Sequence, residues 1–185
     1  MTLAWPAVPG PLNVAQDGSG KPWLTVQSLA AVPLKAPVRA GYSVTRSVSA
    51  VEQKDASKDK TSQWSRGDVV RVRIEVEAQT DMTWVVVSDP VPGGATILGS
   101  GLGRDSAILT GTEKRSGNAW PAYEERSFEA FRSYFEYLPK GKHVIEYTVR
   151  LNNPGKFSLP PTRVEAMYAP ETFGEVPNAM VDVTQ

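Results

Sequence analysis

A strict alternation of apolar and charged residues is the sequence feature that most constrains this fold. It runs over Val70–Ala78, with an aliphatic residue at every second position and arginine or glutamate between. Successive side chains of a strand point to opposite faces, so the pattern predicts a β-strand with one buried and one solvated side. We predict that Val72, Ile74 and Val76 are buried. Arg71, Arg73 and Glu75 are predicted to face solvent.

Several other segments have the β-branched and aromatic composition of strands. Thr83–Ser88 is apolar on both faces, which predicts a central strand covered on both sides, with Trp84 in the core. The spacing of residues 123–138 fits a helix or a strand, and the aromatic content and the turn at Pro139 favour a strand leading into a hairpin. Further strands are predicted at residues 42–48, 143–151, 156–159, 163–168 and 180–183.

Proline and glycine, fifteen of each, separate these segments at intervals of about 8–12 residues, which is typical of antiparallel sandwiches. We therefore predict an all-β fold, an antiparallel β-sandwich of immunoglobulin-like architecture. Residues 1–40 are richer in proline and glycine and hold one predicted strand, 23–30. We place a soft boundary near Gly41, with 1–40 a partial linker or neighbouring β module and 41–185 the sandwich domain.

The composition argues against catalysis and against several kinds of partner. The chain has no cysteine, so it holds no disulfide, thiolate metal site or thioester, and its one histidine, His143, leaves little for a zinc site or a catalytic triad. We predict a chain that is not an enzyme and uses no metal or cofactor. Twenty basic and twenty acidic residues predict no nucleic-acid binding. The sequence contains no apolar run of about 18 residues, so we predict no direct membrane insertion. The first residues lack the basic start and the apolar run of a signal peptide.

Short motifs have weak functional interpretations. Arg66–Asp68 spells the integrin-binding tripeptide, but Gly-Asp is also ordinary turn chemistry. Gly99–Arg104 only loosely resembles a phosphate-binding loop, because its spacing and context differ. The serines beside acidic residues, Ser106 and Ser127, lack a nucleophile motif, and His143 is interpreted as a structural or solvent-exposed histidine.

Aromatic residues are concentrated in residues 120–137. They either fill the core or line an interface, because tyrosine and tryptophan are enriched in recognition surfaces. Alternation sends neighbours such as Tyr134 and Phe135 to opposite faces, so part of the set must face outward or lie beneath another element. The candidate interdomain interface consists of Trp120, Tyr123, Tyr134 and Tyr137.

Four strings resemble, in their order, the C-terminal macroglobulin-like domain of bacterial alpha-2-macroglobulins. The resemblance runs from about residue 41 to the end of the chain. The strings are Arg66–Val72, Val87–Gly94, the run from Tyr147 to Pro161, and Val164–Glu171.

The resemblance implies a β-sandwich within a large periplasmic protein, often anchored to the inner membrane, that traps endopeptidases. The chain would be a non-catalytic scaffold or interaction domain. Its partners would be other domains of the parent chain, such as a thioester-like domain, and a trapped protease through the parent. The chain has no cysteine for a thioester and no bait-like segment. The alternative is a stand-alone adhesion or structural module of the cell surface.

Overall fold

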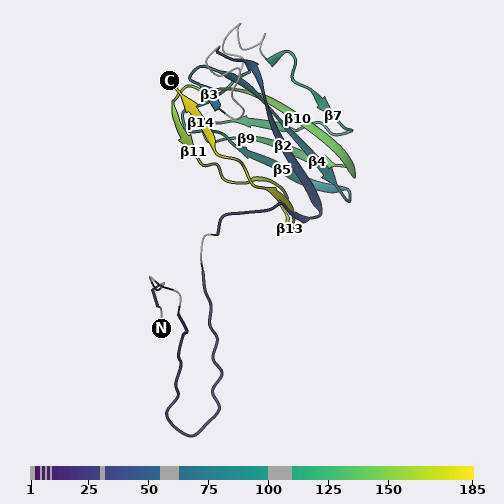
Figure 1. The fold of residues 1–185 in the computed structure, drawn as a ribbon. Helices are drawn as coiled ribbons and strands as arrows, with labels where there is room; N and C mark the ends of the chain where they lie inside the picture. Colours follow the sequence, from purple (N-terminus) through teal and green to yellow (C-terminus); the bar gives the residue numbers. More distant parts are fainter. Residues whose placement is uncertain are drawn as a thin grey trace. The chain divides into compact units, whose positions relative to one another are not determined.

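The computed structural model describes residues 3–4, 6, 8, 10–29, 32–54, 63–99 and 110–185 (Figure 1). The chain divides into two units, Met1–Val32 and Pro33–Gln185. The described part of the first unit contains no helix or strand, so the strand predicted at 23–30 is wrong over its described residues. Trp23 is 99% exposed, and an extended segment becomes a β-strand only when another strand pairs with it.

Fourteen strands form three sheets in the described part of the second unit. Sheet A has the order β1-β13-β12-β5-β9-β8, sheet B has the order β2-β4-β10-β6 with β7 also on β10, and sheet C has the order β11-β14-β3. The strands are β1 (Val38–Ala40), β2 (Tyr42–Glu52), β3 (Gln63–Ser65), β4 (Val69–Ala78), β5 (Met82–Pro90), β6 (Thr96–Ile97), β7 (Arg115–Ser116), β8 (Tyr123–Arg126), β9 (Ala130–Leu138), β10 (Gly141–Arg150), β11 (Gly155–Phe157), β12 (Thr162–Ala166), β13 (Ala169–Val176) and β14 (Val181–Thr184).

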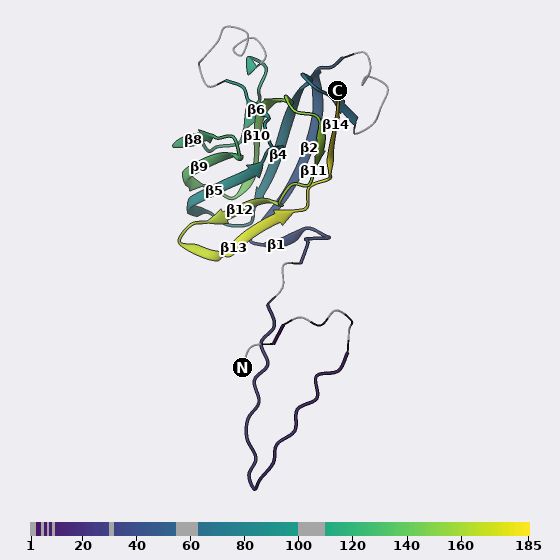
Figure 2. The same cartoon turned by 90° about the vertical axis from the view of Figure 1, so that its left-hand side faces the viewer.

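Sheets A and B face each other as the two layers of a sandwich (Figure 2). Their strand pairs are antiparallel, which confirms the predicted fold class, whereas β3 and β14 of sheet C run parallel. The interior is filled by alternate aliphatic residues of the two sheets and by the stacked rings of Phe131 and Tyr147, whose centroids lie 4.3 Å apart. No helix in the described residues is long and apolar enough to cross a membrane.

Strand β4 confirms the alternation with one exception. Val72, Ile74 and Val76 are buried, while Glu75 is exposed and Arg73 is half-exposed. The prediction for Arg71 is wrong, because this residue is only 9% exposed. Its guanidinium donates hydrogen bonds to the hydroxyls of Thr148 and Thr112, at 3.0 and 3.1 Å. A distant segment therefore covers this end of the charged face.

Strand β5 is central in sheet A, as predicted, but Trp84 does not belong to the core. Trp84 is 48% exposed and has a φ of 55°, a left-handed conformation that is unfavourable for a bulky residue. The ladder to β9 pairs Thr83 with Tyr137 and then Val85 with Phe135. This register is unbroken and Val85 is fully buried, so alternation places Trp84 on the outer face of the sheet, the same face as Val86.

Residues 123–138 form strands, as favoured, but the predicted hairpin at Pro139 is wrong. The antiparallel pair in this region is β8 with β9, in sheet A. After β9 the chain crosses to sheet B, where β10 pairs with β4. A proline–glycine turn reverses the chain but does not specify which sheet the next strand joins.

Candidate interaction surface

The outer face of sheet A carries a row of side chains, one from each of five neighbouring strands. Successive ladder partners are Tyr123 on β8, Tyr134 on β9, Val86 on β5, Glu165 on β12 and Phe173 on β13. Directly paired residues of antiparallel strands project to the same face, so these five side chains lie side by side. We call these five residues, together with the exposed Trp84 and Tyr168 described below, the aromatic face.

Two tyrosines form the best-defined part of this face. The rings of Tyr123 and Tyr134 are 5.9 Å apart and inclined at 33°. The Tyr134 hydroxyl donates to Glu125 Oε2 at 3.1 Å, and Arg132 donates to Glu125 Oε1 at 2.8 Å. Partial burial and the Glu125 carboxylate raise the pKa of Tyr134. Tyr134 is thus held in place, while Tyr123 is 64% exposed above it.

A charged row runs beside the aromatic one. Arg132 and Arg163 flank Ser88 across β9, β5 and β12, and Arg163 pairs with Glu175 of β13 at 2.5 Å. The Arg163 guanidinium also lies 4.5 Å from the centre of the Phe173 ring. Since the arginines already have carboxylate partners, this row resembles the polar rim of an interface around an aromatic centre.

A second exposed cluster lies at the start of β5. The rings of Trp84 and Tyr168 meet edge to face, with centroids 6.3 Å apart, and Met167 donates its N–H to the Trp84 carbonyl at 2.7 Å. Tyr168 is 79% exposed, and Met167 is 47% exposed. The sequence reasoning missed these residues, because Trp84 was assigned to the core and residues 167–168 to a strand rather than a turn. Val85 and Val87 are buried, so alternation along β5 was the signal that could have placed Trp84 outside.

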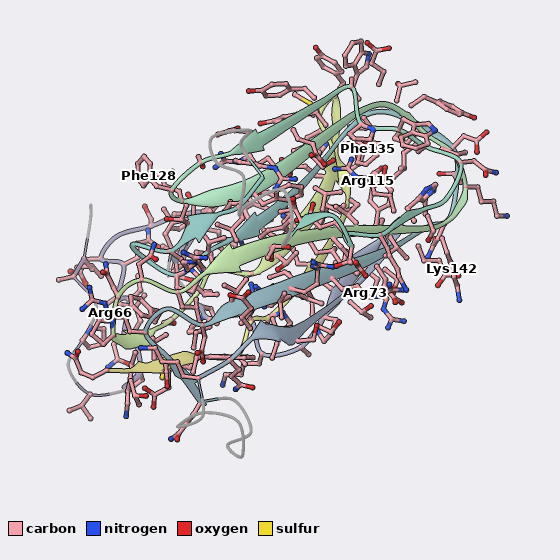
Figure 3. The ribbon with its side chains drawn as sticks, turned by 90° about the horizontal axis from the view of Figure 1, so that it is seen from above. Arg66, Arg73, Arg115, Phe128, Phe135 and Lys142 are labelled. Carbon is pink, nitrogen blue, oxygen red and sulfur yellow. The ribbon has the colours of Figure 1, made fainter. Side chains whose placement is uncertain are left out.

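The four residues of the predicted interface are distributed unevenly. Tyr123 and Tyr134 are in contact, whereas Tyr137 lies near the far end of β9, where its hydroxyl donates to Asp81 at 2.8 Å. Trp120 precedes β8 and is 80% exposed. Of the remaining aromatics, Phe131 and Phe135 are buried, and Phe128 is 77% exposed at the β8–β9 turn. Figure 3 shows Phe128 at one end of the sandwich and Lys142 at the other. The interface itself stays a prediction.

The outer face of sheet B is occupied by an ion-pair network. Glu146 accepts hydrogen bonds from Arg73 at 2.9 Å and from the N–H of Lys114 at 2.7 Å, and Arg71 lies 3.7 Å away. Burial by itself raises the pKa of Glu146, but these donors and positive charges outweigh it and leave the pKa below its ordinary value. Residues 110–116 supply several of the partners, so the chain itself covers this face.

A buried carboxylate connects the two sheets. Asp89 of β5 is fully buried and accepts hydrogen bonds from Arg46, at 2.9 Å, and from the hydroxyls of Tyr147 and Thr162. Burial and the negative charge of Asp89 raise the pKa of Tyr147 well above its ordinary value. Each oxygen of Asp89 has donors from other strands, which makes this cluster a structural link between sheets. No cluster of potential metal ligands occurs in the described ranges.

The weak motifs are structural where they are described. Asp68 is 1% exposed, and its carboxylate accepts the N–H groups of Ser65 and Lys54 at 2.8 and 2.9 Å. The tripeptide Arg66–Asp68 therefore lacks a free carboxylate for an integrin. His143 is buried and donates from Nε2 to the Pro139 carbonyl at 2.8 Å, as expected of a structural histidine. The Ser127 hydroxyl bonds to Ala130 within its own turn. Residues 100–106, with most of the glycine loop and Ser106, lie outside the described residues.

The sandwich and its aromatic face define a macroglobulin-like β domain without a catalytic constellation in the described residues. A family model, the bacterial alpha-2-macroglobulin MG10 domain, matches residues 41–171. The match covers more than half of the chain, so the chain belongs to this family. The resemblance stated from the sequence is confirmed.

Named relatives agree with this assignment. The chain is 26% identical over 172 residues to alpha-2-macroglobulin of Escherichia coli, covering 86% of this chain and 10% of that protein. It is 25% identical over 142 residues to an alpha-2-macroglobulin homolog of Nostoc sp., covering 72% of this chain and 7% of the homolog. The crystal structure of trypsin-activated alpha-2-macroglobulin from E. coli has the same fold, with a TM-score of 0.63 at 18% identity over 81% of this chain and 11% of that one. The chain spans a tenth or less of the length of the E. coli and Nostoc proteins.

Proposed function

We propose that this chain is a non-catalytic scaffold and contact domain of a large bacterial alpha-2-macroglobulin-type endopeptidase inhibitor. The match to the MG10 family over residues 41–171 carries this proposal. The parent protein would act in the periplasm, trap proteases, and use this domain to hold its other domains, among them a thioester-like domain. The chain has no cysteine, so any covalent capture would depend on residues elsewhere in the parent.

The aromatic face is the surface we assign to contacts within the parent. Tyr123, Trp84 and Tyr168 are 64%, 48% and 79% exposed, and paired charges lie next to them. An interface that has not yet bound its partner typically exposes aromatic side chains surrounded by polar ones, and the aromatic face has this composition. The alternative of a stand-alone adhesion module gains no support from the Arg66–Asp68 tripeptide, because Asp68 is buried.

Inhibition of a protease tests this proposal at two levels. The 185-residue chain alone should leave digestion of a protein substrate by trypsin unchanged, whereas the parent should inhibit it. In the parent, Tyr123→Ala or Trp84→Ala should reduce the inhibitory capacity at least about threefold, because truncating a central interface aromatic typically costs more than 1 kcal/mol.

Phe128→Ala is the matched control, since Phe128 is 77% exposed but lies at a turn outside the aromatic face. This variant should inhibit as the wild type does. Inhibition by the isolated chain would contradict the scaffold role. Equal behaviour of all three variants would contradict the assignment of the interface.

A further inference from the structure

Strand β2 has a free edge. It is 11 residues long, lies at the end of sheet B and pairs with β4 on one side. Among the described residues, no backbone hydrogen bond reaches residues 45–52 from the other side. An edge of this length presents a row of unpaired N–H and C=O groups to any extended chain that approaches it.

The other sheet edges in the described residues are protected by their length or charge. Strands β1, β3 and β11 have three residues each, and β6 and β7 have two each. Strand β8 has four residues, three of which are charged. Short or charged edges are the usual means by which proteins prevent unwanted strand pairing. Between Ser47 and Val51, strand β2 has no charged residue and no proline.

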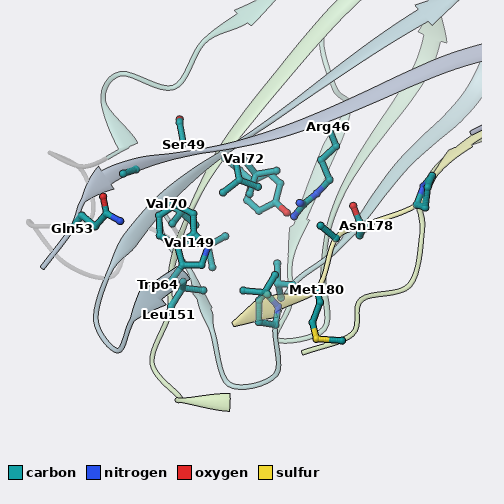
Figure 4. A pocket seen from close by; sticks show the side chains of 18 residues that line it. Arg46, Ser49, Gln53, Trp64, Val70, Val72, Val149, Leu151, Asn178 and Met180 are labelled. Atoms are coloured by element: carbon teal, nitrogen blue, oxygen red, sulfur yellow. The ribbon is translucent and has the colours of Figure 1, made fainter. Parts of the chain in front are cut away.

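A cavity opens beside this edge. Its volume is about 620 Å³, and residues from β2, β4, β10 and the segment before β14 line it. Figure 4 shows Val70, Val72 and Val149 on one side of the cavity and Asn178 and Met180 on the other. Val48 also lines the cavity but is 38% exposed, so the space between the sheets is open to solvent along β2.

The charge of the cavity indicates which side chains would fit it. Arg46 is the charged residue of its lining, and Asp89 already neutralises it at 2.9 Å. A charged side chain entering the cavity would lose its hydration and gain no free opposite charge. Apolar, uncharged side chains are therefore complementary to it. On the opposite face of β2, Thr45 and Ser47 are exposed and suit small polar neighbours.

We propose that the β2 edge is a docking site for an extended segment of a partner protein, with uncharged apolar side chains at alternate positions. The main chain of the partner would pair with β2 and extend sheet B, and its apolar side chains would enter the cavity. This is strand addition, in which main-chain hydrogen bonds provide affinity and pockets for alternate side chains provide specificity. The surface differs from the aromatic face and serves a second partner segment.

Fluorescence anisotropy with the 185-residue chain tests the proposal. The probe is a labelled synthetic peptide of alternating threonine and valine, seven residues long. Two N-methylated versions carry the methyl groups on the amides of one edge or the other. The unmethylated peptide should bind saturably. Only one edge of the peptide pairs with β2, so one methylated version should bind at least about tenfold more weakly and the other should bind like the unmethylated peptide. A peptide with serine in place of valine should not bind.

A matched pair of protein variants locates the site. Val48→Lys places a charge in the cavity, whereas Val51→Lys places one on the same strand without lining it. The two valines are 38% and 36% exposed, so both variants should melt like the wild type. Val48→Lys should weaken peptide binding at least about tenfold, and Val51→Lys should change it less than about twofold.

Several outcomes would overturn the proposal. The proposal is wrong if the unmethylated peptide does not bind saturably. It is also wrong if the two methylated peptides bind equally well, or if the two lysine variants bind the unmethylated peptide equally well. The peptide comparison needs no protein variant, so it stands even if Val48→Lys fails to fold. Light scattering gives one further test. If the chain forms a dimer that the substitution Val48→Lys dissociates, the occupant of the β2 edge is a second copy of this chain, and the proposal of a partner segment is wrong.

Discussion

The outer faces of the two sheets differ in how far the chain itself completes them. On sheet B, residues 110–116 cover the charges of β4 and β10, and Glu146 has three donors or positive charges around it. On sheet A, Tyr123, Trp84 and Tyr168 stay exposed. Both faces would look polar or mixed from alternation alone. The chain itself thus covers part of the face of sheet B, and the exposed aromatic residues of sheet A support the proposal that its face contacts a partner.

The largest effect should come from removing a carboxylate from the covered face. Glu146→Ala should lower the free energy of unfolding by about 3–5 kcal/mol, because it leaves the buried Arg71 without this carboxylate, whereas the half-exposed Arg73 keeps its ion pair with Glu75. Glu165→Ala on sheet A removes a carboxylate 34% exposed and paired with Arg163, so it should cost about 1 kcal/mol or less. Urea melts measure both. Equal losses would remove the distinction between the faces.

A pH series should sharpen the same comparison. The folded pKa of Glu146 lies below its ordinary value of 4.5, so its contribution to stability is complete above pH 4.5 and is lost as the pH falls through the folded pKa. The glutamine side chain of Glu146→Gln does not take up a proton in this range, so the stability of this variant should fall less steeply than that of the wild type below pH 4.5. Thermal melts across acidic pH check this prediction. Parallel acid limbs would show that Glu146 does not have this role.

The smallest effect concerns the strained residue of the exposed face. Trp84 has a φ of 55°, which costs an L-residue about 1–2 kcal/mol relative to glycine, less the entropy that glycine loses on folding. Trp84→Gly should therefore be more stable than Trp84→Ala by about 0.5–1 kcal/mol, although both remove the ring. Differential scanning calorimetry of the pair decides this. An alanine variant as stable as the glycine variant would indicate that the backbone relaxes when the ring is gone.

Much of the aromatic face could be anticipated from the sequence, but its composition could not. Alternation across residues 123–138 indicated that some tyrosines face outward, and Tyr123 and Tyr134 do so together. Val86 and Phe173 join them only through a ladder of five strands that come from three separate parts of the chain. Trp84 lies on this surface because Val85 and Val87 take the inner face of β5, and Tyr168 meets it from the turn between β12 and β13.

The sequence by itself determined the all-β class, the positions of most of the longer strands and the buried aliphatic face of β4, because side-chain periodicity depends on local backbone geometry. It also excluded chemistry that needs cysteine. Only the tertiary structure decided that the chain crosses to sheet B after β9, that Arg71 is covered by a segment about forty residues away, and that β2 has no second strand partner among the described residues. These features depend on which strands pair and on what packs over them, and such long-range choices reflect the packing of the whole domain rather than any local pattern.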